Sequence, residues 1–372
     1  MLMKTAVVAL ATAALMAVIP PSANAQSKPL VYSNYLPPTH ATNRYALEPL
    51  FSAVEKETKG SLKIELHPGG VLVGGKGTAS AIRDGLVDGG FIVSLYHQNE
   101  IPLNTLLSDL ALLSEDPLVT MGAVNETVLL ECEECLQEYR KYKTVYMGAY
   151  ATTPYVMMCK TPVSKLEDLK GLKMRAAGTV YGRLAVELGG VPVNIPNAEA
   201  YEALERGQLD CVIGALSWMQ TLSLWDVAKN TIDLPMGAYF GGAFLAFNER
   251  SWKGVKESDR KVFLDHVPTV LAALAVGYVK DDEDVKSQAQ TKNVEIRSAD
   301  ESLKKMLEEY RKAEIQSAVE AAKKRGVKNP EPLARTFVEK LRKWNAIVAE
   351  TGTDQAKFEQ ALRREIYDKA SF

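Results

Sequence analysis

An arginine followed by small residues is the feature of this sequence best suited to bind a ligand. A short helical segment closes at Gly171, a strand follows, and Arg175 stands at its far end, before the Ala-Ala-Gly run 176–178. A guanidinium matches the fork of a carboxylate, and each charge-assisted hydrogen bond contributes about 1.5–3 kcal/mol. The alternative is a surface arginine paired with Glu167 or Asp168. The local sequence favours neither interpretation.

The four cysteines are the second set of residues whose side chains could take part in chemistry. Cys132 and Cys135 form a CxxC pair, whereas Cys159 and Cys211 stand alone. In an oxidising compartment a structural disulfide between Cys132 and Cys135 is favoured, with unpaired or differently paired thiols as the alternative. A redox-active pair is least favoured, because two glutamates lie between the cysteines and disfavour a thiolate. Zinc would require a second ligand pair, and Cys159 and Cys211 are not spaced as one.

Other chemical motifs are incomplete or absent. Residues 70–76 satisfy the phosphate-loop pattern GxxxxGK, but Gly77 stands where a Ser or Thr should hold magnesium, so a structural turn is favoured. The sequence contains neither HExxH nor GxSxG, and its four histidines have no metal-ligand spacing. The sequence therefore predicts no metal site, no cofactor and no enzyme.

The first 25 residues have the organisation of a secretory signal peptide. Lys4 precedes an apolar run over residues 6–19, and the small-residue pattern Ala-Asn-Ala at 23–25 predicts cleavage after Ala25. The apolar run is shorter than the roughly 20 residues that a membrane span requires. We therefore expect a periplasmic protein, away from ATP and nicotinamide cofactors.

Composition narrows the function further. The chain has 372 residues, 47% hydrophobic and 24% charged, with a formal net charge of −2. This length predicts two domains. No basic stripe indicates nucleic acid binding, and no second apolar run indicates a membrane span.

Helix and strand patterns alternate along the chain and occur twice in the same order. Residues 83–88 (RDGLVD) also match residues 205–210 (ERGQLD), with a glycine at the helix end and an aspartate before a buried strand. Two similar α/β lobes are therefore predicted. The expected elements are helices over 47–54, 79–86, 180–188 and 198–205, strands over 62–66, 91–93, 191–195 and 211–213, and, beyond residue 259, helices over 303–310, 318–324, 331–349 and 355–368.

Several of these segments together resemble one family. The runs 166–175 (LEDLKGLKMR), 189–193 (GGVPV) and 201–210 (YEALERGQLD) are similar to the signature of the DctP family, the solute-binding proteins of TRAP transporters. Residues 67–70, 82–88 and 248–252 agree with its pattern too. The resemblance implies an α/β, two-lobed periplasmic binding protein-like fold, with crossing hinge strands and a long helix spanning both lobes. Lobe I would comprise residues 26–152 and 240–280, and lobe II residues 153–239 and 281–372.

The resemblance also assigns site residues. In that family the arginine at the position of Arg175 holds the ligand carboxylate. Many members carry a second arginine where this chain has Tyr155. Many also read Gly-x-Glu-Asn after the aspartate that corresponds to Asp210, whereas this chain reads Cys-Val-Ile and then Gly214. These departures remove polar groups from the predicted site.

The ligand expected from these departures has one carboxylate and an apolar or aromatic body. Trp218 and Tyr239 lie in regions that often form the pocket wall, and Asn34 and Tyr96 would add polar contacts. An aromatic or keto acid is therefore predicted, with a C4-dicarboxylate as the alternative.

The family further implies delivery of this organic acid to the small and large integral membrane subunits of a TRAP transporter, driven by an ion gradient. We expect a monomer. A secreted hydrolase or isomerase on the same frame is an alternative, and so is a sensor that passes its closed form to a membrane kinase.

Overall fold

Two long antiparallel strands run through the centre of the computed structural model, which describes residues 28–372. They are β4 (Thr144–Cys159) and β9 (Ala238–Asn248), paired from Thr144 opposite Asn248 to Pro154 opposite Ala238. Every residue of β9 is buried, as expected for a strand covered on both faces. The predicted signal peptide, residues 1–25, lies outside the described residues.

The other strands extend the sheet on both sides of this central pair, in the order β2-β1-β3-β9-β4-β7-β5-β6. On one side β1 pairs in parallel with β2 and β3. On the other side β5 lies between β6 and β7, parallel to both, and β8 pairs with β4 and β10. The bounds are β1 Leu30–Ser33, β2 Ile64–His67, β3 Gly89–Gly90, β5 Lys173–Arg175, β6 Val191–Val193, β7 Cys211–Ala215, β8 Asn230–Asp233 and β10 Glu295–Ser298.

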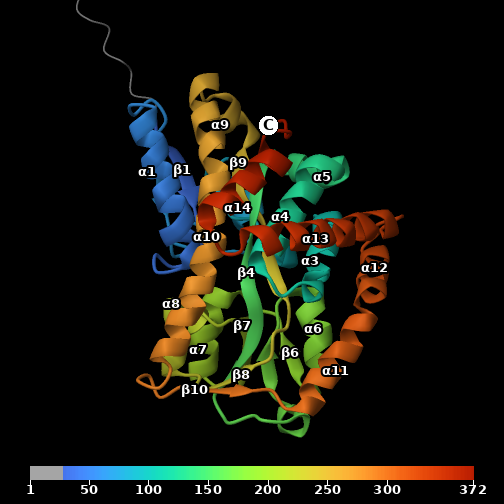
Figure 1. Ribbon diagram of the computed structural model, residues 1–372. Helices are drawn as coiled ribbons and strands as arrows, with labels where there is room; N and C mark the ends of the chain where they lie inside the picture. Colours follow the sequence, from blue (N-terminus) through green and yellow to red (C-terminus); the bar gives the residue numbers. More distant parts are fainter. Residues whose placement is uncertain (1–27) are drawn as a thin grey trace, which may run out of the picture.

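Helices pack around the sheet (Figure 1). Several begin at an aspartate that accepts backbone N–H groups: Asp116 before α4, Asp300 before α11 and Asp354 before α14. The bounds are α1 Glu48–Glu57, α2 Thr78–Arg83, α3 Pro102–Asp109, α4 Pro117–Glu126, α5 Glu133–Lys141, α6 Gly178–Glu187, α7 Ala200–Glu205, α8 Trp218–Thr221, α9 Glu249–Lys253, α10 Glu257–Gln288, α11 Glu301–Lys312, α12 Glu314–Lys324, α13 Glu331–Thr351 and α14 Gln355–Leu362.

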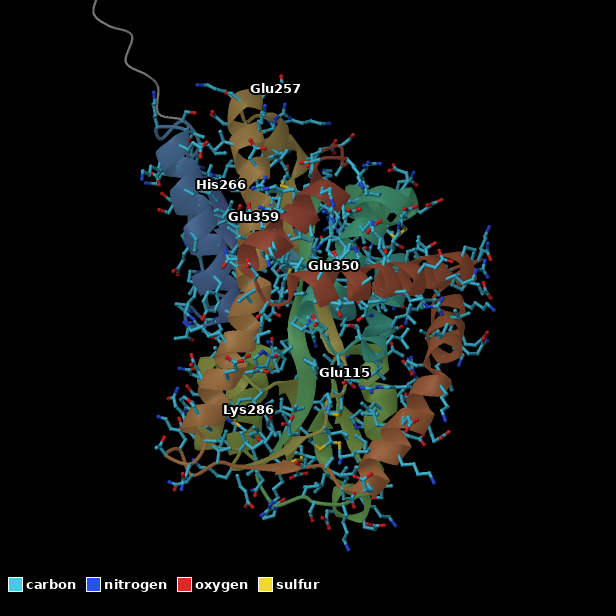
Figure 2. All side chains as sticks on the ribbon, viewed as in Figure 1. Glu115, Glu257, His266, Lys286, Glu350 and Glu359 are labelled. Atoms are coloured by element: carbon cyan, nitrogen blue, oxygen red, sulfur yellow. A yellow bond between two sulfur atoms is a disulfide. The ribbon has the colours of Figure 1, made fainter. Side chains whose placement is uncertain are left out.

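The long helix α10 runs along both halves of the sheet. Glu257, His266 and Lys286 mark its course from one end of the molecule towards the other (Figure 2). Two adjacent carboxylates on it reach different parts of the chain: Asp281 accepts from the Tyr45 hydroxyl at 2.8 Å, and Asp282 accepts from the Ser217 N–H at 2.7 Å. By length and hydropathy alone α10 could cross a membrane, but 56% of its most apolar window is buried inside the molecule.

The internal repeat read from the sequence has a structural counterpart. Asp88 accepts a hydrogen bond from the N–H of Val31 in β1 at 2.8 Å, and Asp210 accepts one from the N–H of Lys173 in β5 at 2.8 Å. In both copies the backbone N–H of the aspartate also bonds the carbonyl of the same strand residue. The two aspartates therefore tie the same kind of turn to the first strand of each half.

One of the expected strands lies elsewhere in the structure. The strand expected over 91–93 is wrong: the strand is Gly89–Gly90, and only Ile92 forms an isolated bridge, to Ala243. The two glycines fit where the chain is crowded, since a Cβ on Gly89 would lie 2.7 Å from the Tyr32 ring. Strand β10 was not predicted because its Glu-Ile-Arg-Ser sequence is short and partly exposed.

The C-terminal helices brace the structure. Helix α13 packs against α4, where the Trp344 ring takes the space that a side chain on Gly122 would need. The Trp344 Nε1 donates to Glu126 at 2.8 Å, and Lys340 bonds the same carboxylate at 2.7 Å. Because the carboxylate has these partners, the α13–α4 contact is held by polar as well as apolar interactions.

Candidate ligand site

Arg175 is buried at the end of β5, with 2% of its surface exposed. Strands β6 and β7 flank β5 on both sides, so its last side chain cannot reach solvent along the sheet. The guanidinium donates to the carbonyls of Ile195 and Ile213, both at 3.1 Å, and to the Tyr96 hydroxyl at 3.4 Å. This burial excludes the alternative of a surface arginine.

No carboxylate within residues 28–372 forms a salt bridge with Arg175. Asp168, one of the two alternative partners, accepts instead from the N–H groups of Ser164 and Lys165. Burial alone would lower the pKa of Arg175, but the nearby Tyr96 and Tyr155 oxygens raise that pKa above its ordinary value. The guanidinium is therefore charged in an enclosed position, where an unpaired charge is costly.

Aromatic rings surround this charge. The Arg175 Cζ lies 5.2 Å from the centre of the Trp218 ring, a cation–π distance. Tyr155 stands edge-on to Trp218 at 5.2 Å between ring centroids, and its ring lies 4.8 Å from Tyr181 and 5.7 Å from Tyr239. Together these four rings form an apolar wall beside the guanidinium.

Each wall residue comes from a different element. Tyr155 stands on β4, opposite Ala215 of β7, and Trp218 opens α8 three residues after that strand pair. Tyr181 lies on α6, which follows Arg175 directly, and Tyr239 lies on β9. The crossing strands and the elements next to β5 thus converge on Arg175.

Two polar atoms of the wall are buried without a hydrogen-bond partner within the described residues. They are the Nε1 of Trp218 and the hydroxyl of Tyr239. A buried donor without a partner costs roughly 1–3 kcal/mol. Both groups belong to the aromatic cluster beside Arg175.

The remaining sequence-predicted residues are placed differently. Tyr96, in the helical turn Ser94–Tyr96, meets Arg175 and also accepts from the Asn197 N–H at 3.3 Å. Gly214 lies beneath Trp218, since a Cβ there would lie 2.2 Å from that ring. Gly214 thus provides the space for the ring and not a polar contact.

Asn34 is engaged elsewhere. Its side-chain amide donates to Asn43 at 2.8 Å and to Thr42 at 3.2 Å, and its oxygen accepts from the Leu36 N–H at 3.2 Å. These bonds organise the loop after β1. No contact in the described structure brings Asn34 to Arg175.

Sequence reasoning missed two tyrosines of the site. Tyr181 stands in the first turns of α6, six residues after Arg175, and that proximity was a usable signal. Tyr35 packs its ring 6.2 Å from Tyr96 and raises the pKa of Arg175. Nothing local marks Tyr35, because its approach depends on how the loop after β1 folds.

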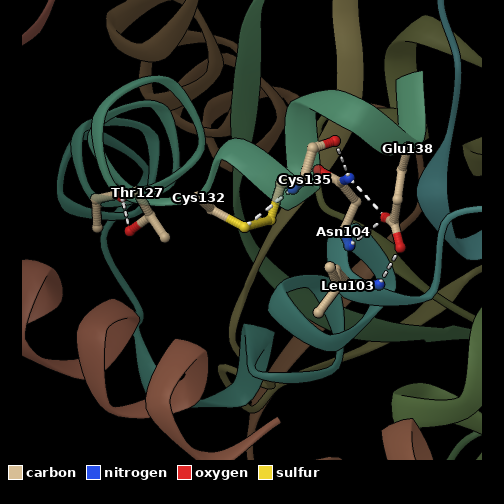
Figure 3. The surroundings of a disulfide bond; sticks show 7 residues. Leu103, Asn104, Thr127, Cys132, Cys135 and Glu138 are labelled. Carbon is tan, nitrogen blue, oxygen red and sulfur yellow. Dashed lines mark hydrogen bonds between the residues drawn. A yellow bond between two sulfur atoms is a disulfide. The ribbon is translucent and has the colours of Figure 1, made fainter. Parts of the chain in front are cut away.

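The CxxC cysteines are joined in a disulfide at the start of α5 (Figure 3). Cys135 is fully buried, and its carbonyl accepts from the Asn104 side chain at 2.9 Å. Glu138, one turn further on, accepts from the N–H groups of Leu103 and Asn104 at the start of α3. The disulfide therefore sits where α5 is fixed to α3.

The other two cysteines also pair, which the sequence did not predict. Cys159 of β4 and Cys211 of β7 are register partners and form a disulfide, at a sequence separation of 52. Both are fully buried. The segment that this bond closes includes Arg175. Within residues 28–372, no group of three or more His, Cys, Asp or Glu side chains is placed to hold a metal ion.

Two lobes on crossing strands, with a long helix along both and an enclosed cation near the crossing, define a solute-binding protein. Residues 32–312 match the family model DctP, bacterial extracellular solute-binding protein family 7. The chain belongs to this family. Its members are receptors that bind a solute and work with membrane subunits.

Three similar proteins are distant in sequence, and each matches this chain over nearly its whole length. The outer membrane transporter protein TsaT of Comamonas testosteroni is 24% identical over 334 residues, 87% of this chain and 95% of TsaT. A TRAP periplasmic solute-binding protein from Bordetella bronchiseptica, solved with bound (R)- and (S)-mandelate, is 24% identical with a TM-score of 0.74, covering 85% of this chain and 99% of that one. One from Rhodoferax ferrireducens, in complex with copurified benzoate, is 19% identical with a TM-score of 0.77, covering 87% and 100%. These likenesses confirm the two-lobed fold.

Proposed function

We propose that this protein captures a small monocarboxylate with an aromatic or apolar body, for uptake by a TRAP transporter. The observation that supports the proposal best is the buried, charged Arg175 without a carboxylate partner in the described chain. A ligand carboxylate would supply the missing charge, and the rings of Tyr155, Trp218 and Tyr239 would contact its body. The mandelate and benzoate bound by two structural neighbours are acids of this kind.

Ligand capture would couple the two lobes. Arg175 belongs to the β5 half of the sheet, whereas Tyr96, which meets it, belongs to the β1 half. A ligand held between the two halves would bind the closed arrangement more tightly than the open one, and would therefore increase the closed population. The closed form would then deliver the acid to the small and large membrane subunits, with an ion gradient as the energy source.

We further propose that the mature protein begins after Ala25, acts in the periplasm as a monomer and catalyses no reaction. The lobe boundaries proposed at 152/153 and 239/240 fall inside β4 and β9, close to Pro154 and Ala238, where the pairing of these two strands ends. We assign α13 and α14 to lobe I and not to lobe II, because α13 packs against α4 and α14 against α10.

Calorimetric titration of the purified protein with benzoate, mandelate and succinate tests the proposal. An aromatic acid should bind, and Arg175→Ala should weaken it at least 100-fold, because breaking a buried charge pair costs roughly 3–5 kcal/mol. Arg206→Ala is the matched control, since the Arg206 side chain is 68% exposed and pairs with Glu202 and not with a residue of the site. Unchanged affinity in Arg175→Ala would refute the assignment of the arginine. Tight succinate binding with none of benzoate or mandelate would favour the C4-dicarboxylate alternative.

A further inference from the structure

A groove of about 930 Å³ lies at the end of the molecule where the described chain begins. It is formed by the turn between α1 and β2, the turn after α2, the connection from β9 to α9 and the residues before α10. These segments gather at the upper end of Figure 1, and Glu257 marks the adjoining start of α10 in Figure 2. The groove shares no residue with the Arg175 site.

The groove is strongly basic. Seven Lys or Arg residues and three Asp residues line it, an excess of four positive charges in a chain of net charge −2. Five of the cations form no salt bridge within residues 28–372: Lys28, Lys59, Lys143, Arg250 and Lys256. Uncompensated charge of one sign in a concave surface raises the local concentration of ions of the opposite sign.

The three aspartates do not neutralise these cations, because each has another partner. Asp84 pairs with Arg83 at 2.8 Å. Asp88 accepts from the Val31 N–H and, at 2.6 Å, from the Ser251 hydroxyl. Asp259 accepts from Ser61 and is only 8% exposed. The five cations therefore face the groove without a salt-bridge partner among the described residues, although the Asp84 charge acts on Lys143.

Two of these lysines occupy an unfavourable backbone conformation. Lys59 has φ 54° and Lys143 has φ 50°, and they are two of four non-glycine residues with positive φ in the described chain. This conformation costs a side chain roughly 1–2 kcal/mol. Glycine would relieve that cost at both positions but would remove the charge. Strain of this kind at exposed residues that line the groove is a reason to look for a role of their side chains.

We propose that this basic groove binds an acidic peptide segment of a protein partner. A recessed surface admits a narrow chain, whereas a flat bilayer would reach only its rim. Flexible ammonium groups can each meet a separate carboxylate along such a segment. The groove needs no second lobe to be complete, so it can hold the partner in both the open and the closed state.

Fluorescence anisotropy with a labelled ten-residue Asp/Glu peptide tests the proposal on the full mature chain. Its Asn/Gln counterpart serves as the neutral probe. The acidic peptide should bind and the neutral one should not, and added salt should weaken the complex. The triple variant Lys59→Gln, Lys143→Gln, Lys256→Gln should lose at least tenfold in affinity.

The matched control removes three other exposed lysines: Lys305→Gln, Lys324→Gln, Lys328→Gln. It loses the same charge and should bind the acidic peptide like the wild type. Equal weakening in both triple variants would overturn the proposal, as would absent peptide binding with retained binding to anionic phosphatidylglycerol vesicles. The affinity of the groove variant for benzoate and mandelate should equal that of the wild type, which separates this test from that of Arg175.

Discussion

The buried carboxylate of Glu314 should make the stability of this protein depend on pH. Glu314 begins α12, is fully buried and pairs with Arg183 of α6. Nearby, Asp109 of α3 pairs with Arg325 at 2.6 Å. Burial raises the pKa of Glu314, Arg183 opposes that rise and the Asp109 charge adds a smaller one, so that the pKa stands at about 7.

The size of the effect follows from this pKa. A rise from 4.5 to about 7, at about 1.4 kcal/mol per unit, corresponds to about 3 kcal/mol. Because the folded state holds the proton more tightly, this contribution is complete below pH 4.5 and is lost as the pH rises through 7. Glu314→Gln carries no titrating group at this position. The stability of the variant relative to the wild type should therefore rise by about 3 kcal/mol between pH 4.5 and pH 8.

Urea unfolding at several pH values across this range measures the difference directly. Other titrating groups are shared by both proteins and largely cancel in the difference. Glu308→Gln is the matched control, since Glu308 is an exposed residue of α11, and its difference from the wild type should not vary with pH. A constant difference for Glu314→Gln would refute the reasoning, whatever its sign at a single pH.

Three further predictions concern other parts of the chain. Burial lowers the pKa of His40 to about 3. Because the unfolded state binds this proton more readily, the wild type should lose stability as the pH falls from about 6.5 towards 3. His40→Gln should flatten that part of an acid-unfolding curve, and an identical curve would contradict this. Replacing Cys159 and Cys211 with Ser should cost about 4 kcal/mol by the loop-entropy relation, measured by urea unfolding, and a loss below 1 kcal/mol would contradict it. Gly214→Ala should displace the Trp218 ring, because the added Cβ would lie 2.2 Å from it. Calorimetry should show that ligand binding is weakened about tenfold or more, while the far-ultraviolet circular dichroism spectrum is unchanged. Unaltered affinity would mean that Trp218 is not part of the site.

The parts of the fold that the sequence predicts are those set by neighbouring residues. The turns that end at Asp88 and Asp210 were recognisable because a glycine in the left-handed region and the following aspartate act within a few positions. Helices α1, α6 and α13 appear close to their expected positions, since their apolar spacing is regular.

The parts that the sequence missed depend on distant partners. Gly89 and Gly90 are a strand only because β1 and β9 lie on either side of them. The bond between Cys159 and Cys211 exists because β4 and β7 align these residues, and sequence spacing carries no information on that register. Tyr35 reaches the site in the same way, through loop packing.

Arg175 could be identified from the sequence as a candidate ligand-binding residue, but its burial could not be predicted from it. Its residue type and its family position indicated a carboxylate ligand, yet a surface ion pair fitted the local sequence equally well. What decides between them is that β5 lies inside the sheet, between β6 and β7, so the guanidinium is enclosed. An enclosed charge that has carbonyl, tyrosine and tryptophan partners but no carboxylate within the described residues lowers stability. A hydrophobic residue would serve the fold better at this position, and the carboxylate ligand that we propose explains why an arginine stands there.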